Sequence, residues 1–420
     1  METDVLIVGG GPVGVFLASL LASQGIDVRV WERRLAEPSA SRAIGIHAPS
    51  LAAFAQIGAE QSVLAQGVRV REGIATSRGL VLGRLRFDRA SDEHPYVVTL
   101  EQWKTEAILR TRLAAVAPDA LSVGTTFRGM SGTADRDALL AHGTIAGGEP
   151  ISIRARFVVG ADGPRSAVRA AMGVGWRGRT LAPQYIMGDF ADPDAQTPGT
   201  RAVHHADGEG PAAEHRPRPA IIDIGPEGLV ESFPLPEGRR RYVALLRNTA
   251  RSGPAEPPAA SAIEPAGTLS PTAAAELAAI VQHRTGTRVN ADTASMTSGF
   301  QVRQFRSARI GVGRAVLIGD AAHEFSPFGG LGMNVGWLDA AALAPLLSSA
   351  IREGSSGPWP VWAAARSRIA RIATLQSRAN MMLGLRSAPG TQAAREALIR
   401  SVLALPTAHT LARMYAMGWV

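Results

Sequence analysis

The sequence contains no cysteine, and only 5% of its 420 residues are aromatic. Without cysteine, neither a disulfide framework nor a metal centre built on thiolates is available. The sequence also has no run of 18 apolar residues, and no charged segment followed by an apolar one after Met1. Such runs and segments mark membrane spans and secretion signals. We therefore expect a cytoplasmic protein with no integral membrane segment.

The charge balance is basic, with 44 Lys and Arg against 36 Asp and Glu and a formal net charge of +8. A basic balance is typical of proteins that bind nucleic acid. Here the arginines are spread along the chain, and no helix-turn-helix, zinc-finger or aromatic RNA-binding pattern accompanies them. We predict no nucleic-acid partner. Abundant Ala, Gly, Pro and Arg indicate the codon bias of a GC-rich genome, and attraction of an anionic nicotinamide cofactor is a secondary role for the charge.

A glycine-rich turn follows the first apolar run of the chain. The run Asp4–Val8 predicts a strand, and Val15–Ser23 predicts an apolar helix. Between them, Gly9, Gly11 and Gly14 have the G-x-G-x-x-G spacing. In this position the first glycine permits a tight turn, the second lets the backbone approach a pyrophosphate, and the third allows close helix–strand packing.

A second predicted strand, Asp27–Trp31, ends at Glu32. A carboxylate at this place can accept hydrogen bonds from both ribose hydroxyls of an adenosine. Strand, glycines, helix, second strand and terminal acid together predict a dinucleotide site. Taken alone, this unit does not separate NAD from FAD.

A second glycine-rich loop lies far along the chain. The apolar run Val316–Ile318 predicts a strand that leads into Asp320, and Pro327 and Gly329–Gly332 precede a helix that we expect to begin near Met333. An Asp at a strand tip can accept hydrogen bonds from a polyol, and a glycine-lined helix N-terminus offers free N–H groups to an electron-rich oxygen. A polyol and an electron-rich ring describe a flavin.

A third motif favours FAD over NAD. The strand pattern that begins at Phe157 ends in Asp162-Gly163, and Arg165, Ser166 and Arg169 follow. With this motif in place, the sequence resembles the flavoprotein aromatic hydroxylases, the single-component monooxygenases that include para-hydroxybenzoate hydroxylase and many polyketide hydroxylases. The resemblance covers roughly residues 4–180 and 296–345.

Two weaker matches support the resemblance. Ser41-Arg42-Ala43 is similar to the family segment whose arginine reaches toward the flavin, and Gln102 with Glu106 and Leu109 is similar to its flavin-contacting helix. The residues that we expect to bind FAD are Gly9, Gly11, Pro12, Val13, Gly14, Glu32, Arg33, Arg42, Gln102, Asp162, Asp320, Pro327, Gly330, Gly332, Met333 and Asn334. The resemblance further implies that Arg165 and Arg169 respond to the nicotinamide cofactor, and that His323 is structural.

The family implies FAD as cofactor, NADPH or NADH as co-substrate, and O2. It implies hydroxylation of an aromatic or polyketide-like small molecule through a C4a-hydroperoxyflavin, as in secondary metabolism and antibiotic biosynthesis. Because the cofactor carries this chemistry, we expect no Ser-His-Asp set and no pair of catalytic carboxylates, and we assign no catalytic side chain. Instead, backbone N–H groups of Gly332, Met333 and Asn334 should stabilise negative charge at the flavin edge.

Other functions remain open on the same motifs. A flavin oxidase, a reductase, a Baeyer–Villiger oxygenase or an epoxidase would carry similar binding residues. A flavin-binding regulatory protein without turnover is an alternative of a different class. The sequence does not identify the substrate, the preference for NADH or NADPH, or the oligomeric state, for which we expect a monomer or a homodimer.

The predicted fold class is α/β, with a Rossmann-like FAD-binding domain (residues 1–180 and 296–350) that carries split insertions. Residues 181–295 should form an antiparallel sheet that binds substrate, with a linker rich in Pro and Ala over 251–271, and residues 351–420 a C-terminal helical segment. We expect 80–87 and 95–100 to pair as strands and 121–127 to be a single strand.

Some aromatic and histidine residues have no clear assignment from the sequence. Aromatic residues that could line a substrate pocket or simply fill the core are Trp176, Tyr185, Phe190, Phe233 and Phe300. No further ligands in register accompany the histidines at 204, 205 and 215, so no metal site is predicted.

Overall fold

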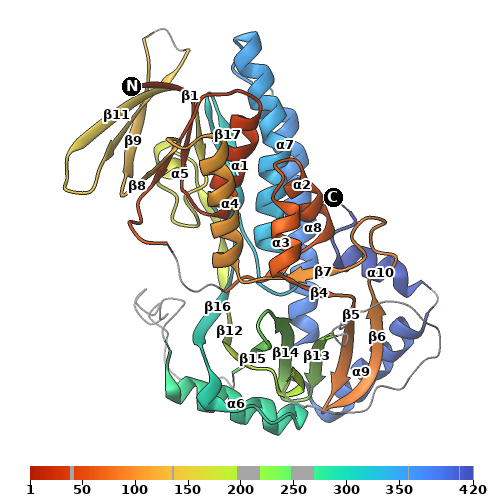
Figure 1. Cartoon of the computed structure of the whole chain (residues 1–420). Helices are drawn as coiled ribbons and strands as arrows, with labels where there is room; N and C mark the ends of the chain where they lie inside the picture. Colours follow the sequence, from red (N-terminus) through yellow and green to blue (C-terminus); the bar gives the residue numbers. More distant parts are fainter. Residues whose placement is uncertain are drawn as a thin grey trace, which may run out of the picture.

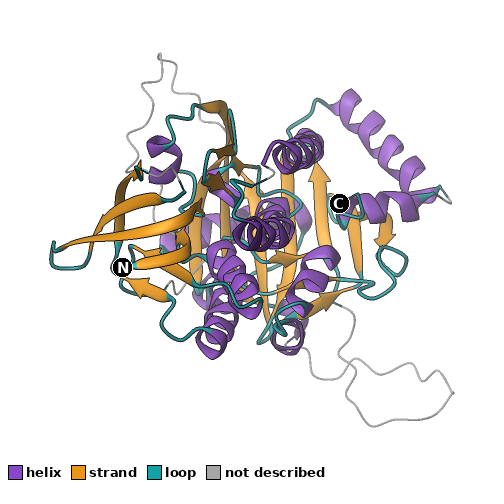
Figure 2. Cartoon of the chain, turned by 90° about the horizontal axis from the view of Figure 1, so that it is seen from above, coloured by secondary structure: helices purple, strands orange, loops and turns teal. Residues whose placement is uncertain are grey.

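The structure, a computed structural model, describes residues 1–37, 42–134, 137–195, 218–246, 269–357, 359–405 and 407–419 (Figure 1). Two eight-stranded sheets and one small three-stranded sheet form its framework. Figure 2 shows the strands crossing the width of the molecule, with helices packed against them. Three short 3-10 helices are Pro193–Ala195, Ala291–Thr293 and Gly319–Ala321.

The first sheet is built on a parallel core in the order β18-β11-β1-β2-β8. Val5, Leu6 and Ile7 of β1 are fully buried, as expected for a central parallel strand covered on both faces. An antiparallel extension, β9-β10, continues from β11. The strands are β1 (Glu2–Val8), β2 (Val28–Glu32), β8 (Leu121–Val123), β9 (Thr126–Gly132), β10 (Leu139–Thr144), β11 (Pro150–Gly160), β17 (Gly311–Val312) and β18 (Ala315–Leu317).

Helix α1 (Pro12–Ser23) is apolar on every side because it lies in the interior, in contact with both α4 (Gln102–Val116) and α7 (Leu331–Glu353). Pro12 stands in its first turn, where the missing N–H costs nothing. The described residues also form the helices α2 (Ala48–Ala55), α3 (Glu60–Gln66), α5 (Ala167–Ala171), α8 (Trp359–Leu383), α9 (Pro389–Ala404) and α10 (Ala408–Tyr415).

The second sheet is antiparallel except where β13 pairs with β5. Its order is β19-β16-β12-β15-β14-β13-β5-β6. The strands are β5 (Glu72–Ser77), β6 (Leu80–Arg86), β12 (Trp176–Ala191), β13 (Ala220–Gly225), β14 (Gly228–Leu235), β15 (Arg239–Leu245), β16 (Met296–Ser307) and β19 (His323–Glu324). The three-stranded sheet contains β3 (Gly45–Ile46), β7 (Val97–Thr99) and β4 (Val68–Val70).

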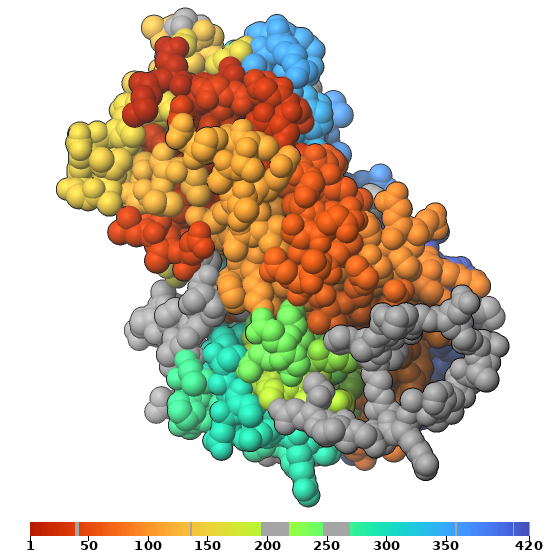
Figure 3. Space-filling view, in the orientation of Figure 1, coloured from red at the N-terminus to blue at the C-terminus, as the bar shows by residue number. Residues whose placement is uncertain are grey.

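Helix α6 (Pro271–Thr285) covers one face of the second sheet through Ala274, Leu277 and Val281. Its N-terminus is capped by Ser270, whose Oγ accepts a hydrogen bond from the Ala273 N–H at 3.3 Å. Figure 1 shows α6 below this sheet, while Figure 3 shows the second sheet (green and teal) meeting the N-terminal segments (red to orange) on one continuous surface.

The structure confirms the predicted fold class, with a parallel nucleotide-binding layer, a mostly antiparallel second sheet and C-terminal helices. The expected pairing of 80–87 with 95–100 is wrong. Strand β6 pairs with β5, which the sequence analysis did not predict, and β7 pairs with β3 and β4. The hairpin turn that joins β5 to β6 at Arg78 and Gly79 has positive φ at both residues.

The expected single strand over 121–127 is also wrong, because Gly124, at φ +71°, breaks it into β8 and β9. Strand β12 runs from Trp176 to Ala191, so the boundary expected between residues 180 and 181 falls within a strand. The tail after residue 408 packs in the structure, with Ala412 and Ala416 against Phe87 and Val97.

The histidines at 204, 205 and 215 and residues 251–268 of the expected linker lie outside the described residues. Ser41 does too. Across the ranges given above, no helix is long and apolar enough to cross a membrane. In the same ranges, no group of three or more His, Cys, Asp or Glu side chains is arranged to hold a metal ion.

Candidate active site

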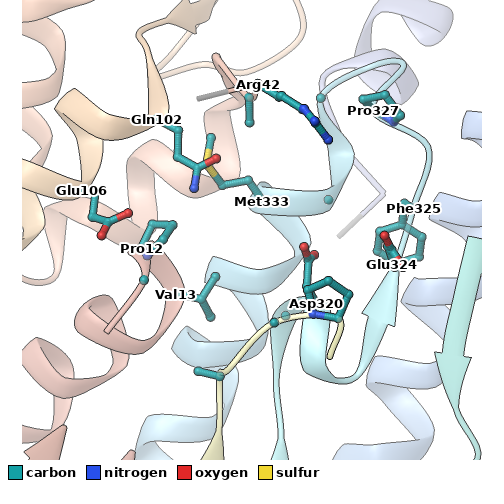
Figure 4. Close-up of a pocket in the computed structure, with 18 of the residues that line it drawn as sticks. Pro12, Val13, Arg42, Gln102, Glu106, Asp320, Glu324, Phe325, Pro327 and Met333 are labelled. Atoms are coloured by element: carbon teal, nitrogen blue, oxygen red, sulfur yellow. The ribbon is translucent and has the colours of Figure 1, made fainter. Parts of the chain in front are cut away.

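A cavity of about 700 Å³ extends from the glycine-rich turn after β1 to the face of the second sheet that α6 does not cover. Val8, Ala161 and Ile318, at the carboxyl ends of β1, β11 and β18, line its first part. Ligands of open α/β sheets bind at this edge. In Figure 4, Gln102, Met333, Arg42 and Asp320 surround one common space, although they come from four separate segments.

The three glycines of the turn have three different surroundings. A Cβ at Gly9 would lie 2.3 Å from the Ala161 carbonyl oxygen, and Gly9 has φ +110°. A Cβ at Gly14 would lie 2.0 Å from the Gly9 oxygen, so helix and loop pack without room for a side chain. At Gly11 a Cβ would meet nothing within 4 Å, because this residue faces the cavity. The turn is thus tight on one side and open on the other, as a pyrophosphate requires.

Glu32 stands at the end of β2 and holds the turn in place. Its Oε2 accepts a hydrogen bond from the Gly10 N–H at 2.8 Å, and its Oε1 accepts from the backbone N–H and Nε of Arg34 at 2.8 and 3.0 Å. Burial opposes ionisation, but the hydrogen bonds and charge of Arg34 lower the pKa of Glu32 below its usual value. Its Oε2 also accepts from Arg34 Nη2 at 3.2 Å. Glu32 is therefore a carboxylate at neutral pH.

Arg34 also links Glu32 to the helix that carries Gln102. Its Nη2 donates to Glu106 at 3.2 Å, and Arg110 donates from Nη2 to Glu106 at 3.0 Å and to the Gly10 carbonyl at 2.8 Å. The pairing fixes α4 against the glycine-rich turn. Gln102, in the first turn of this helix, lines the cavity.

Asp162 caps the short helix α5 and keeps one oxygen free. Its Oδ2 accepts hydrogen bonds from the Ala167 and Val168 N–H groups at 2.7 and 3.2 Å. Its Oδ1 is buried and has no hydrogen-bond partner among the described residues. Because an unsatisfied buried oxygen is costly, a ligand donor at this place is expected.

Asp320 points into the middle of the cavity (Figure 4). Although the side chain opens into the cavity, loss of solvation by the surrounding protein raises the pKa of Asp320 to about 6. The negative charge of Glu324 raises this pKa further, and His323 lowers it. No hydrogen bond joins its carboxyl group to another described side chain. A hydroxyl-rich ligand would supply the missing donors.

Asp339 of α7 anchors the segment that carries Asp320. It accepts hydrogen bonds from the Gly319 N–H at 3.1 Å and from Arg366 Nε at 2.6 Å, and its Oδ2 lies 2.6 Å from His323 Nε2. Burial alone would raise the pKa of Asp339, but His323 and Arg366 hold it below its usual value. His323 is 3% exposed and does not line the cavity, in agreement with the predicted structural role.

The loop before α7 is held by two buried side chains. Asn334 Oδ1 accepts from the His47 N–H at 2.9 Å, and its Nδ2 donates to the carbonyls of Gly45 and Gly330 at 2.9 and 2.7 Å. His47 Nε2 lies 2.9 Å from the Gly329 carbonyl oxygen. Burial lowers the pKa of His47 to about 4, so it is neutral at pH 7 and donates to that oxygen.

Helix α7 begins at Leu331, two residues before the expected start. The N–H groups of its first four residues have no partner within the helix. Gly332 and Met333 of this turn line the cavity, whereas the Asn334 side chain is fully buried behind it. The N-terminus of a 23-residue helix thus faces the cavity, where it favours negative charge.

Arg42 lies between the two parts of the cavity. Its Nε donates to Ser298 Oγ at 3.1 Å, and its carbonyl accepts from Arg241 Nη1 at 2.5 Å. Arg241 is 2% exposed and forms a two-point ion pair with Asp189, at 2.6 and 2.7 Å. This buried pair ties the Arg42 segment to the second sheet.

The far part of the cavity is mainly apolar and aromatic. Met187, Val243, Phe300 and Phe328 line it, with the Phe300 and Phe328 ring centroids 6.5 Å apart. Tyr415 of α10 reaches it from the C-terminal end of the chain. Flat, carbon-rich molecules fit such walls.

Most of the predicted site residues share the cavity. Those that line it are Gly9, Gly11, Pro12, Val13, Glu32, Arg33, Arg42, Gln102, Asp162, Arg165, Asp320, Pro327, Gly330, Gly332 and Met333. Gly14, Arg169 and Asn334 do not line it. Arg169 donates to the carbonyls of Ala321 and Pro164 and stacks over Trp176 at 3.9 Å, so its guanidinium is engaged in the fold.

Of the aromatic residues without an assignment, Phe233 and Phe300 line the cavity, while Tyr185, Phe190 and Trp176 do not. Arg34, Asp339, Glu231 and the Asp189–Arg241 pair were not predicted from the sequence. For Asp339 within the buried stretch of α7 and Glu231 within β14, a charged residue inside an otherwise apolar run is the signal that could have found them.

The cavity fits FAD in three respects. The open side of the turn at Gly11 leaves space for phosphates, Asp162 and Asp320 offer unpaired carboxyl oxygens, and the N-terminus of α7 faces the middle of the cavity. Phosphate, polyol and electron-rich ring each have a counterpart there.

Comparison with known proteins agrees with this geometry. The family model described as "FAD binding domain" matches residues 2–224 and 257–377. Rifampicin monooxygenase of Streptomyces venezuelae is 29% identical over 95% of this chain and 75% of its own length. 6-Methylpretetramide 4-monooxygenase of Streptomyces rimosus is 30% identical over 83% of this chain, which spans little more than half, 56%, of that relative.

Among solved structures, p-nitrophenol 4-monooxygenase of Pseudomonas putida superposes with a TM-score of 0.81 at 20% identity, covering 100% of this chain and 98% of its own. At that identity the likeness shows the fold. The family model covers most of the chain and names the cofactor that the cavity fits. The chain therefore belongs to the FAD binding domain family, the flavoprotein family whose aromatic hydroxylases its three motifs resemble.

Proposed function

We propose that this protein is an FAD-dependent monooxygenase that hydroxylates an aromatic or polyketide-like small molecule with NAD(P)H and O2. The observation that carries the proposal is a single cavity that joins a dinucleotide-type turn to an aromatic chamber. The relatives are monooxygenases of aromatic and polyketide compounds, which supports the same class of substrate here. By the resemblance, bound FAD supplies the oxygen-transfer chemistry as a C4a-hydroperoxyflavin.

We assign the residues of this chain to binding, orientation and exclusion of water. Glu32 accepts ribose hydroxyls, Asp320 accepts hydroxyls of the ribityl chain, and Gln102 and Arg42 border the flavin ring. Backbone N–H groups of Gly332 and Met333 stabilise negative charge on the ring edge, by about 0.3–2 kcal/mol for a helix N-terminus. Arg165, which is exposed and lines the cavity, is a cation available to an incoming nicotinamide cofactor.

The domain division is part of the proposal. The layer around the first sheet binds FAD, and the second sheet binds the aromatic substrate between its uncovered face and Arg42. Because Met187, Val243, Phe300 and Phe328 exclude water there, a reactive oxygen species is protected from side reactions.

The test is turnover of the purified protein. We expect a yellow protein that consumes NADPH faster when a suitable phenol is added, and that places one atom of labelled O2 in the product. Product without label, formed with consumption of NADPH, would contradict hydroxylation and favour an oxidase or reductase. Label in an ester or an epoxide would identify a Baeyer–Villiger oxygenase or an epoxidase. Bound flavin that stays oxidised under excess NADPH would favour the non-catalytic alternative.

A further inference from the structure

The substrate end of the cavity contains an acidic side chain that the proposed chemistry does not use. Glu231 of β14 lines the cavity and is 7% exposed. Side chains alternate along a strand, so Glu231 and Phe233 share one face, and both line the cavity. Glu231 therefore faces the aromatic chamber and not α6 on the other side of the sheet.

Glu231 has no partner for its carboxyl group among the described residues. Its neighbours across the sheet are Ile222 and Val243, which are apolar. Arg241, one strand away, has its Nε and Nη2 on Asp189 and its Nη1 on the Arg42 carbonyl. A buried carboxyl group without a partner costs free energy, so its position is explained most simply by a partner that arrives with the ligand.

Two titratable groups, Tyr185 on β12 and Tyr415 on α10, have pKa values that burial raises, and both lie close enough to Glu231 for its charge to raise these values further. Arg241 on the neighbouring strand β15, Arg42 and His47 line the same cavity. Both arginines are engaged elsewhere, and His47 is neutral at pH 7. Burial raises the pKa of Glu231 to about 8.

We propose that Glu231 binds a phenolic hydroxyl of the substrate and accepts its proton, a role that rests on the proposed hydroxylase function. In the step, the O–H bond of the phenol breaks, the proton passes to a carboxylate oxygen of Glu231, and the electron pair stays on the phenolate oxygen. Nothing is oxidised or reduced in this step. The phenolate then donates electron density to the ring, whose carbon becomes a better nucleophile for oxygen transfer.

The environment makes this proton transfer feasible. An ordinary glutamic acid has a pKa of about 4.3 and a phenol one of about 10, a gap of roughly six units that opposes the transfer. A buried glutamic acid with a pKa of about 8 narrows this gap, and its ionised form, whose fraction grows as the pH rises through about 8, is the form that accepts the proton. As the pH rises through about 8 and Glu231 ionises, the same surroundings should reject a substrate whose carboxylate points at Glu231, because two negative charges would meet in an apolar chamber. The site therefore selects a phenol at this end.

The test uses the FAD-loaded protein and 4-nitrophenol, whose phenolate absorbs visible light and whose phenol does not. Difference spectra give both its affinity and its ionisation on the protein as the pH is varied. We expect Glu231→Gln to weaken binding about tenfold to a hundredfold, the range for a hydrogen bond to a charged group. The pH transition of bound 4-nitrophenol should shift or disappear. The matched control, Phe233→Leu, changes the same wall without an ionisable group and should keep the wild-type transition.

Unchanged affinity and an unchanged pH profile in Glu231→Gln would overturn the proposal. So would a wild-type protein that binds no 4-nitrophenol while NADPH still reduces its flavin, and this result leaves the hydroxylase function standing. Loss of the proposed function itself is recognised separately, by flavin that NADPH does not reduce. Because Gln removes an unpaired acid and keeps the shape, thermal unfolding of the variant should occur at or above the wild-type temperature, which separates the effect on binding from misfolding.

Discussion

Replacement of Asp339 by Asn should destabilise the protein and weaken FAD binding together. Asp339 is 1% exposed and is the shared partner of Arg366, His323 and the Gly319 N–H. In the variant, the buried guanidinium of Arg366 keeps its charge but loses its counter-ion. Removal of one member of a buried pair costs about 3–5 kcal/mol.

This loss is large against the total stability of a folded domain, which is roughly 5–15 kcal/mol. Urea unfolding followed by circular dichroism measures it as a lower midpoint at an unchanged slope. The control is Asp4→Asn, whose partner Arg156 lies at 3.3 Å in a half-exposed pair. Such a pair contributes about 0–1 kcal/mol, so the control should unfold close to the wild type.

The acid side of the unfolding curve provides a second measurement. Because the folded-state pKa of Asp339 is lowered, its contribution is present above the unfolded value of about 3.9 and is lost as the pH falls through the folded value. Asp339→Asn should remove this part of the acid dependence. A loss below about 1 kcal/mol at neutral pH, within the range of an exposed pair, would refute the argument that the Arg366 charge depends on Asp339.

Three further predictions concern the loops around the cavity. Glu32→Gln should weaken FAD binding by about tenfold or more, the effect of losing one charge-assisted hydrogen bond. Fluorescence titration of the apo protein with FAD measures this affinity, and an affinity equal to that of the wild type would contradict the ribose role. Gly332→Ala should fold normally, because its Cβ would come no closer than 4.0 Å to Phe325. Gly330→Val should lower the midpoint of thermal unfolding, because Gly330 has φ +65°. Stopped-flow reduction of the alanine variant by NADPH then tests whether the flavin ring moves. Because buried His47 is neutral in the folded protein, the free energy of unfolding should fall by about 3 kcal/mol as the pH is lowered from 6.5, the unfolded pKa of His47, to about 4. Unfolding of His47→Gln, measured at a series of pH values, should show a smaller decrease.

Several residues that we predicted to bind FAD line the cavity, and their positions follow from local spacing in the sequence. Gly9, Gly11 and Asp320 each follow an apolar strand, so the chain positions them within a few residues of a recognisable pattern. The strand and helix patterns around them predicted the parallel layer for the same reason. The turn at Arg78 and Gly79 was not predicted, because Arg-Gly is a weaker hairpin signal than Asn-Gly.

The residues that escaped prediction act through partners far along the chain. Asp189 and Arg241 meet only because β12 and β15 pair, and Asp339 meets Arg366 only because two helices pack. Sequence periodicity assigns such residues to an apolar face but does not say which charge they will face. The role of Glu231 likewise cannot be predicted without the register of β14, which places its side chain on the cavity face of the sheet.

The long strands β12 and β16 are shared by the two parts of the molecule. At one end of the ladder, beside the nucleotide layer, Trp176 pairs with Ser307. At the other end, beneath the substrate chamber, Asp189 pairs with Met296. The ladder shifts register between Thr180 and Gln184, but paired residues continue on both sides of this irregularity. We expect the two shared strands to oppose a wide hinge opening of the two parts, because bending would break pairs of the ladder. Substrate must then enter through shifts of loops and side chains, and heat should melt both parts in one cooperative transition, not in two.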